Sequence, residues 1–166
     1  MKSYRPLCPS DVTSIEISWS EPQLIQGFKD PEVEYPDNGY FYKFIGIHGK
    51  SNRLFYIGKT YSRYVSRRIK DADHKRKQEE FHKSHPKHKL YISVGFIPPR
   101  KKISPKFISD IENLLIYAHS NDDFKFLKNR KSIYNHHVIK NYHIINQGYL
   151  DDHMLPEIYY GLFIRD

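Results

Sequence analysis

Two aromatic segments joined by a short polar connection constrain the fold of this chain most strongly. Residues 40–47 and residues 54–58 are dense in the aromatic and β-branched side chains that strands favour. The polar residues 48–52 lie between them, and Asn38-Gly39 ahead of them is a turn signal. The pattern predicts an antiparallel hairpin at the start of the regular core.

Three further elements follow the hairpin, in the order helix, strand, helix. Residues 64–80 carry apolar side chains at helical spacing, and residues 90–97 alternate as a strand does. The clearest element is a helix over residues 104–118, where Ser104 is a capping residue and Pro105 suits the first turn.

The ends of the chain are predicted to be extensions of this core. Residues 1–37 form an N-terminal extension packed on a core of residues 38–135, and its stretch Val12–Trp19 alternates like a half-buried strand. Residues 136–166 form a C-terminal extension, a possible DNA-contact or dimer segment. The apolar run Ile158–Ile164 within it is expected to be a last strand or a contact surface.

The charge balance favours a polyanionic partner. The 166 residues carry 27 Lys and Arg against 19 Asp and Glu, which gives a formal net charge of +8 and a pI near 9.4. Nucleic acid suits such a surface, and a merely well-hydrated basic surface is the alternative. Cys8 is the single cysteine, so an internal disulfide is excluded. No stretch is apolar enough for a membrane span or a signal peptide, and we expect a cytoplasmic protein without a membrane partner.

Glu112 is the candidate metal ligand. On a helical wheel it lies about 100° from the centre of the apolar face, so its carboxylate can point along the sheet into a cleft. Mg²⁺ keeps several waters and often completes its shell with substrate phosphates. A lone Glu therefore predicts an ion that binds firmly only when nucleic acid is present, and an ordinary solvated helix residue is the alternative.

Tyr42 and Tyr56 fall on adjacent strands of the hairpin, and Lys59 follows at the strand exit. A phenol with an ordinary pKa of about 10 is a weak base unless cations lower that value. Lys59 can supply such a charge and also hold a phosphate. Strand packing is the alternative for each tyrosine.

Basic side chains of the first helix are candidate phosphate ligands. Arg67 and Arg68 face about 100° apart. Arg68 borders the sheet and is the preferred phosphate clamp, while Arg67 is expected to join Asp71 and His74 in a surface row. Specific contact with a nucleic-acid backbone, or else a solvated face, is expected for the run Lys75, Arg76 and Lys77.

These motifs, in this order, resemble the GIY-YIG nuclease family over residues 39–130. The second family motif is intact as Tyr56-Ile57-Gly58 and is followed by Lys59-Thr60, whereas the first keeps only its tyrosine in Tyr40-Phe41-Tyr42.

Two later segments extend the resemblance. Arg68-Ile69 matches the Arg and hydrophobic pair of the family's first helix, at a longer spacing from Tyr56 than usual. One turn on, where many members carry His or Tyr, this chain has Ala72, so either His74 takes over this role or the role is absent. The segment Ile111–Ile116 resembles the metal-binding helix, with Glu112 as the ligand.

The resemblance implies an α+β fold, a small three-stranded antiparallel sheet flanked by helices, with residues 38–135 as the GIY-YIG-like nuclease core and short N- and C-terminal extensions. It implies hydrolysis of phosphodiester bonds with one Mg²⁺ or Mn²⁺ on Glu112 and no small-molecule cofactor. Members also carry an Asn beyond the metal-binding helix, for which Asn129 is preferred over Asn135 and Asn146. The implied catalytic set is Tyr42, Tyr56, Lys59, Arg68, His74, Glu112 and Asn129.

Within this family a compact chain suits a stand-alone enzyme. The expected function is a metal-dependent endonuclease acting on double-stranded DNA, of the type II restriction kind. A palindromic recognition site would then favour a homodimer, with Ile158–Ile164 as the candidate interface. The alternatives are a phage or mobile-element endonuclease and a non-cleaving nucleic-acid-binding module.

Overall fold

The computed structural model describes residues 4–6, 12–32, 40–99, 103–120, 128–129, 141–160 and 163–165. The strands and helices within these ranges are β1 Tyr4–Pro6, β2 Val12–Trp19, β3 Gln23–Leu24, β4 Phe41–His48, β5 Ser51–Lys59, α1 Val65–Arg68, α2 Ala72–Ser84, β6 Lys89–Phe96, α3 Pro105–Ala118, β7 Asn141–Gly148, β8 Glu157–Tyr160 and β9 Phe163–Arg165. The Asn38-Gly39 turn signal lies outside the described residues.

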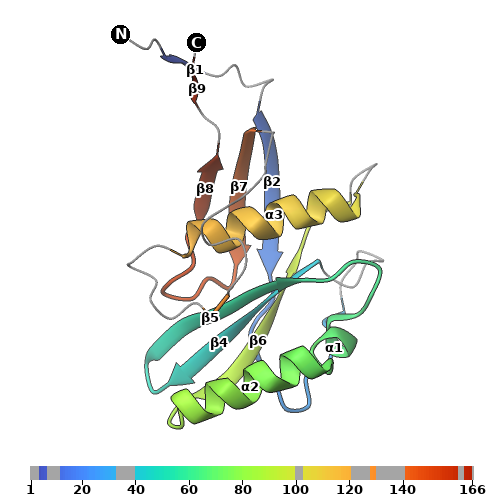
Figure 1. Ribbon diagram of the computed structural model, residues 1–166, viewed down its shortest axis with the longest axis vertical. Helices are drawn as coiled ribbons and strands as arrows, with labels where there is room; N and C mark the ends of the chain where they lie inside the picture. Colours follow the sequence, from blue (N-terminus) through green and yellow to red (C-terminus); the bar gives the residue numbers. More distant parts are fainter. Residues whose placement is uncertain are drawn as a thin grey trace.

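One large mixed sheet organises the described part of the chain. Seven of the described strands belong to it, in the order β5-β4-β6-β2-β7-β8 with β3 beside β6. Strand β4 runs antiparallel to both β5 and β6, whereas β2 and β7 are parallel along their full length, from Val12 opposite Asn141 to Trp19 opposite Gly148. Figure 1 shows the consequence, a lower part built from β4, β5 and β6 and an upper part built from β2, β7 and β8.

The prediction of a small three-stranded antiparallel sheet flanked by helices is therefore wrong. The sheet continues past β6 because Ser18 and Trp19 of β2 pair with Phe96 and Gly95, and it then curls into a half-barrel through β7 and β8. Helices are few among the described residues: α1, α2 and α3. The residues assigned to terminal extensions thus supply β2, β7 and β8 to the main sheet.

Opposite faces of the lower part of the sheet pack on different helices. Neighbouring side chains of a strand point to opposite faces. Phe41 accordingly joins the apolar cluster that contains Ile108 and Ile111 of α3, whereas Tyr42 joins the cluster that contains Val65 of α1 and Phe81 of α2. Each face of β4 is buried, which explains its near-continuous apolar sequence.

Two buried polar groups hold the β7–β8 connection against the rest of the fold. Lys43 of β4 donates to Asp151 Oδ2 at 2.9 Å, and both side chains are fully buried. His119, directly after α3, donates through Nδ1 to the Leu115 carbonyl at 2.6 Å and accepts the Leu155 N–H at Nε2 at 2.9 Å. Burial lowers the pKa of His119 to about 4, so the imidazole is neutral at pH 7.

Candidate active site

Two tyrosines lie side by side on the α2 face of the hairpin formed by β4 and β5. Tyr42 is paired with Gly58 and Phe44 with Tyr56, and the ring centroids of Tyr42 and Tyr56 are 6.2 Å apart. A Cβ atom on Gly58 would lie 2.5 Å from both Cζ and Oη of Tyr42. Glycine at this position therefore makes the space that the Tyr42 phenol occupies.

His74 brings α2 into contact with these tyrosines. Its side chain is fully buried and its Nε2 is hydrogen-bonded to the Tyr42 hydroxyl. The imidazole is enclosed by aromatic rings, with centroids 5.5 Å from Tyr42, 5.7 Å from Tyr56 and 6.0 Å from Phe44. The expectation that His74 joins a surface row is wrong.

A break in the predicted helix explains the position of His74. Residues 64–80 do not form one helix, because α1 ends at Arg68 and α2 begins at Ala72, with Asp71 in an extended conformation between them (φ −64°, ψ 151°). The break turns the start of α2 so that His74 faces the sheet. The helical periodicity of the sequence carries no sign of this turn.

Arg68, rather than Arg67, borders the cluster formed by Tyr42, Tyr56 and His74. Its guanidinium donates to Asp71 at 2.6 Å and to both carboxylate oxygens of Asp73 at 3.1 Å. Arg67 is exposed and lies 5.9 Å from the Tyr64 ring. The positive charge of Arg68 acts on Tyr42, since it opposes the rise in the pKa of that phenol.

The electrostatics of the cluster keep its phenols protonated. Burial raises the pKa of Tyr42 well above its ordinary value, with further contributions from Tyr56 and Glu112. Burial likewise raises the pKa of Tyr56 to about 12. Burial lowers the pKa of His74, although its hydrogen bond with Asp73 opposes this change. At neutral pH the cluster thus holds two neutral phenols and a neutral imidazole.

Lys59 and Glu112 lie together where β5 meets α3. Lys59 Nζ is 4.0 Å from a Glu112 carboxylate oxygen and is hydrogen-bonded to the Ser109 hydroxyl. Glu112 is close enough to the tyrosines for its charge to raise the pKa values of both phenols. Its own side chain is 17% exposed, so the carboxylate is accessible from solvent at the edge of the cluster.

The donor set around Glu112 fits a cation that keeps most of its waters. Within the described ranges, no group of three or more His, Cys, Asp or Glu side chains is arranged to hold a metal. A lone, partly exposed carboxylate is compatible with Mg²⁺ or Mn²⁺ bound through one protein oxygen, waters and phosphate oxygens. It does not fit zinc, which takes three or four protein ligands.

The three candidate asparagines have different positions. The Asn129 side chain bonds the backbone of Ile57, since its Oδ1 accepts the Ile57 N–H at 2.9 Å and its Nδ2 donates to the Ile57 carbonyl at 2.7 Å. Asn129 therefore holds the backbone of Ile57, the β5 residue between Tyr56 and Gly58. Asn146 is buried in the upper part of the sheet, where it accepts from Trp19 Nε1 at 3.0 Å. Asn135 lies outside the described residues.

The basic run at the start of α2 does not form one surface. Lys77 points to the tyrosines, with Nζ 4.6 Å from the Tyr56 ring centroid, while Arg76 is exposed.

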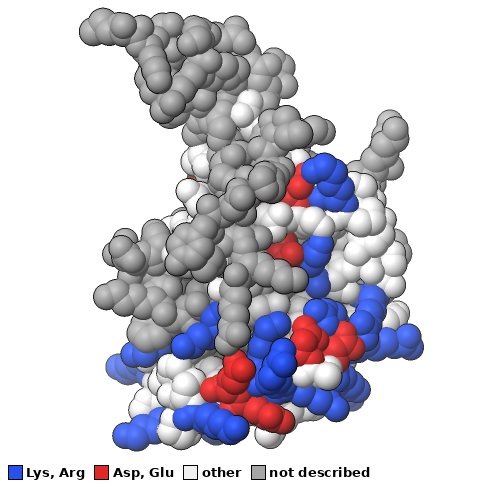
Figure 2. Space-filling view, viewed as in Figure 1, with Lys and Arg blue, Asp and Glu red and all other residues white. Residues whose placement is uncertain are grey.

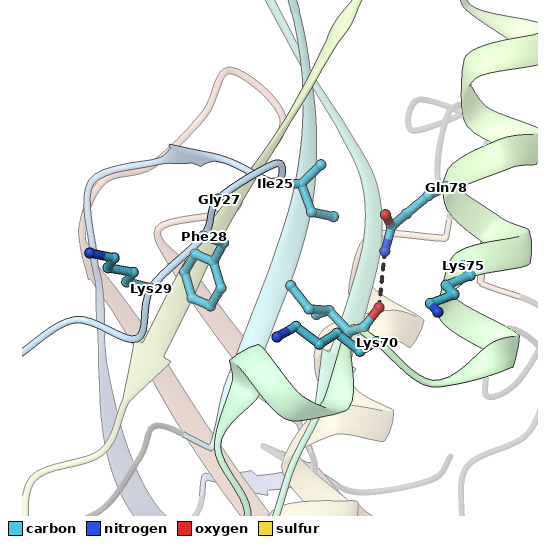
Figure 3. A pocket seen from close by; sticks show the side chains of 8 residues that line it. Ile25, Gly27, Phe28, Lys29, Lys70, Lys75 and Gln78 are labelled. Carbon is cyan, nitrogen blue, oxygen red and sulfur yellow. Dashed lines mark hydrogen bonds between the residues drawn. The ribbon is translucent and has the colours of Figure 1, made fainter.

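Lys75 instead borders a hollow of about 360 Å³ on the other flank of α2 (Figure 3). Apolar and basic side chains line that hollow, among them Ile25, Phe28, Lys29, Ile69 and Lys70. Figure 2 shows Lys and Arg gathered over the part of the molecule where α1 and α2 lie, with acidic side chains among them.

Two residues of the site were not predicted from the sequence, and a third was predicted in another role. Asp73 contacts both Arg68 and His74, Ser109 contacts Lys59, and Lys77 was assigned only to nucleic-acid contact. For Asp73 a usable signal was its position directly before the only histidine given a site role. For Ser109 the usable signal was its position one helical turn before Glu112.

The candidate dimer segment is partly internal. Ile158 of β8 is 7% exposed and belongs to the apolar cluster under α3, whereas the next residue, Tyr159, is 52% exposed. Residues 161–162 of this segment lie outside the described ranges, and β9 pairs with β1.

In comparisons with family models, curated proteins and solved structures, nothing matches this chain. None of the helices within the described ranges has the length and apolar character of a transmembrane span. Functional assignment therefore rests on the geometry and chemistry of the residues above.

Proposed function

We propose that this chain is a divalent-metal-dependent endonuclease that hydrolyses phosphodiester bonds in DNA, with the catalytic residues of the GIY-YIG nucleases set on a larger mixed sheet. The observation that carries the proposal is the grouping of two phenols, an imidazole, a guanidinium and a carboxylate from five separate elements, β4, β5, α1, α2 and α3. A type II restriction role is the favoured biology, and a phage or mobile-element nuclease is the alternative.

Each residue has a role that its position allows. Tyr42 would orient and help deprotonate the attacking water, and Lys59 and Arg68 would stabilise negative charge on the phosphate oxygens. Arg68 is held by two aspartates, so its guanidinium is fixed in place before substrate arrives. A Mg²⁺ or Mn²⁺ ion on Glu112 would supply Lewis-acid charge at the scissile phosphate.

The direct test compares plasmid cleavage by the wild type and by Glu112→Gln, with and without Mg²⁺. Asp110→Asn is the matched control, because Asp110 lies on the same helix and pairs only with Lys106 among the ion pairs of the described residues. We expect the wild type and Asp110→Asn to cut with metal and Glu112→Gln to be inactive. Discrete fragments would support the restriction role, and diffuse nicking would count against it.

Two outcomes would contradict the proposal. Equal cutting by Glu112→Gln and the wild type would show that Glu112 is not the metal ligand. Salt-sensitive DNA binding without any cleavage would instead favour the non-cleaving binding module.

A further inference from the structure

Asp73 contacts His74 and can fix the tautomer of its imidazole. No role was predicted for Asp73 from the sequence. Its Oδ2 lies 3.0 Å from His74 Nδ1. A carboxylate is an acceptor only, so the Nδ1 atom must carry the proton that this hydrogen bond uses. Arg68 donates to both oxygens of the same carboxylate and holds the pKa of Asp73 well below its ordinary value. Asp73 is thus ionised throughout the neutral range.

The tautomer of His74 determines the direction of the next hydrogen bond. A neutral imidazole with its proton on Nδ1 has a lone pair on Nε2. Tyr42 is bonded to that Nε2, so its O–H is the donor and its oxygen retains acceptor capacity. The Tyr56 ring lies 6.2 Å from the Tyr42 ring, and Lys77 Nζ lies 3.5 Å from the Tyr56 hydroxyl. The bonds from Tyr42 to His74 and from His74 to Asp73 thus point in one direction, toward Asp73.

The surroundings disfavour a tyrosinate in this cluster. Tyr42 is 1% exposed, and Phe44 and Tyr56 complete the aromatic wall around it. A charged phenolate would lose its hydration in such a site, which is the reason that the pKa of Tyr42 is raised. A catalytic role for Tyr42 therefore requires that it passes a proton on rather than ionises before reaction.

We propose that Asp73 is a positioning residue that holds His74 as its Nδ1–H tautomer, so that Tyr42 relays a proton from the attacking water to His74 Nε2. The inference rests on the proposed nuclease function. The arrangement has the logic of an aspartate, histidine and hydroxyl triad, in which the aspartate selects the tautomer and stabilises the imidazolium.

During hydrolysis the attacking water loses one proton through Tyr42 to His74. The water oxygen forms a bond to phosphorus as the bond from phosphorus to the leaving oxygen breaks. The water proton moves to Tyr42 Oη while the Tyr42 proton moves to His74 Nε2, so Tyr42 ends neutral and His74 ends as an imidazolium next to Asp73. The leaving oxygen takes a proton from solvent, and His74 returns its proton to solvent after the product leaves.

The charges that face His74 set the pH range in which the relay operates. Asp73 favours the protonated imidazole, and Arg68 and Lys77 disfavour it. Tyr42 faces the same ring from β4 and is itself influenced by Glu112 of α3. Since burial holds the pKa of His74 below its ordinary value, His74 is a neutral acceptor at pH 7.

The experiment compares Asp73→Asn with Asp71→Asn. The Asp71 carboxylate bonds Arg68 and Arg63 but makes no bond with the His74 imidazole, so its variant reports the effect of disturbing these arginines while the Asp73–His74 contact stays in place. We expect Asp73→Asn to lower kcat by about 10²–10⁴-fold, the usual range for lost acid–base assistance, and Asp71→Asn to lower it by less than about 10-fold. Equal losses in the two variants would overturn the positioning role.

Two further readouts separate positioning from mere structural support. The ring-nitrogen NMR spectrum of ¹⁵N-histidine protein, assigned with His74→Gln, is expected to show the Nδ1–H tautomer in the wild type and its loss in Asp73→Asn. An Nε2–H tautomer in the wild type would overturn the inference, and this measurement needs neither DNA nor catalytic activity. The kcat/KM of the wild type is expected to be flat from pH 7 to 9, whereas a tenfold rise per pH unit would indicate a phenolate base and overturn the relay.

The two proposals fail in different ways. Absence of cleavage by the wild type would overturn both the nuclease function and the relay. The tautomer of His74 would still show whether its Nδ1 donates to Asp73. If the wild type cleaves DNA but His74 is the Nε2–H tautomer, the nuclease function is retained and the positioning role of Asp73 is overturned.

Discussion

Gly58→Ala is the substitution whose effect follows most directly from the structure. The new Cβ would lie 2.5 Å from Cζ and Oη of Tyr42, and ordinary contact begins at 3.4 Å, so the phenol has to retreat by about 0.9 Å. Tyr42 is buried and its hydroxyl is bonded to His74, so a displacement of the phenol disturbs both its packing and this hydrogen bond. Overpacking of this kind costs about 1–3 kcal/mol.

The assay for Gly58→Ala is a double-mutant cycle with Tyr42→Leu, measured by urea unfolding. In a strand interior, alanine is otherwise better than glycine by about 0.5–1 kcal/mol. We therefore expect Gly58→Ala to destabilise the wild type and to be neutral or stabilising in the Tyr42→Leu background, with a coupling of about 2 kcal/mol.

The same displacement is expected to affect catalysis. A shift of about 1 Å in a reacting group can cost about 10²-fold in rate, and we expect that loss for Gly58→Ala with Mg²⁺ and plasmid DNA. A stability change below about 0.5 kcal/mol, or equal changes in both backgrounds, would refute the packing argument at Gly58.

Two further predictions concern the buried polar groups near the β7–β8 connection. The pKa of His119 is about 4 in the fold against about 6.5 unfolded, so its stabilising contribution is complete above pH 6.5 and is lost as the pH falls toward 4, by up to about 3 kcal/mol. His119→Gln is expected to remove this part of the pH dependence of urea unfolding, and an unchanged slope would contradict the role given to His119. Lys43→Met leaves Asp151 buried without its cation and is expected to cost about 3–5 kcal/mol, most of which a Lys43→Met/Asp151→Leu double variant should recover. Equal unfolding free energies for the single and double variants would show that the ion pair is not the source of the loss.

The elements of the lower sheet could be predicted because their signals are local. The aromatic segment at 40–47 and the alternating segment at 90–97 correspond to β4 and β6, and Ser104 caps α3 by accepting the Phe107 N–H at 3.1 Å. The hairpin then aligns Tyr42 and Tyr56 without any distant contact. Local patterns are the part of a sequence that periodicity can interpret.

The remainder depends on contacts between distant residues. The parallel pairing of β2 and β7 joins Val12 to Asn141, and the inward-facing Asn146 interrupts the apolar alternation that would have revealed β7. The break between α1 and α2 is likewise invisible in the helical periodicity, although the contact of Arg68 with Asp73 spans only five residues. The size of the sheet was therefore not available from periodicity or spacing, and only its position next to His74 pointed to Asp73.

The pairing of β2 with β7 has a consequence for how the chain is made. During synthesis β4, β5 and β6 emerge in succession and can pair at once, because each lies next to a strand close to it in the sequence. Strand β2 emerges before all of them, yet most of its length has β7 as its partner among the described strands, and only Ser18 and Trp19 pair with β6. Ile15 and Ile17 are fully buried in the folded protein. Until residues 141–148 have been synthesised, most of β2 in a nascent chain therefore lacks its partner strand and has an unpaired edge, and unpaired strand edges favour aggregation.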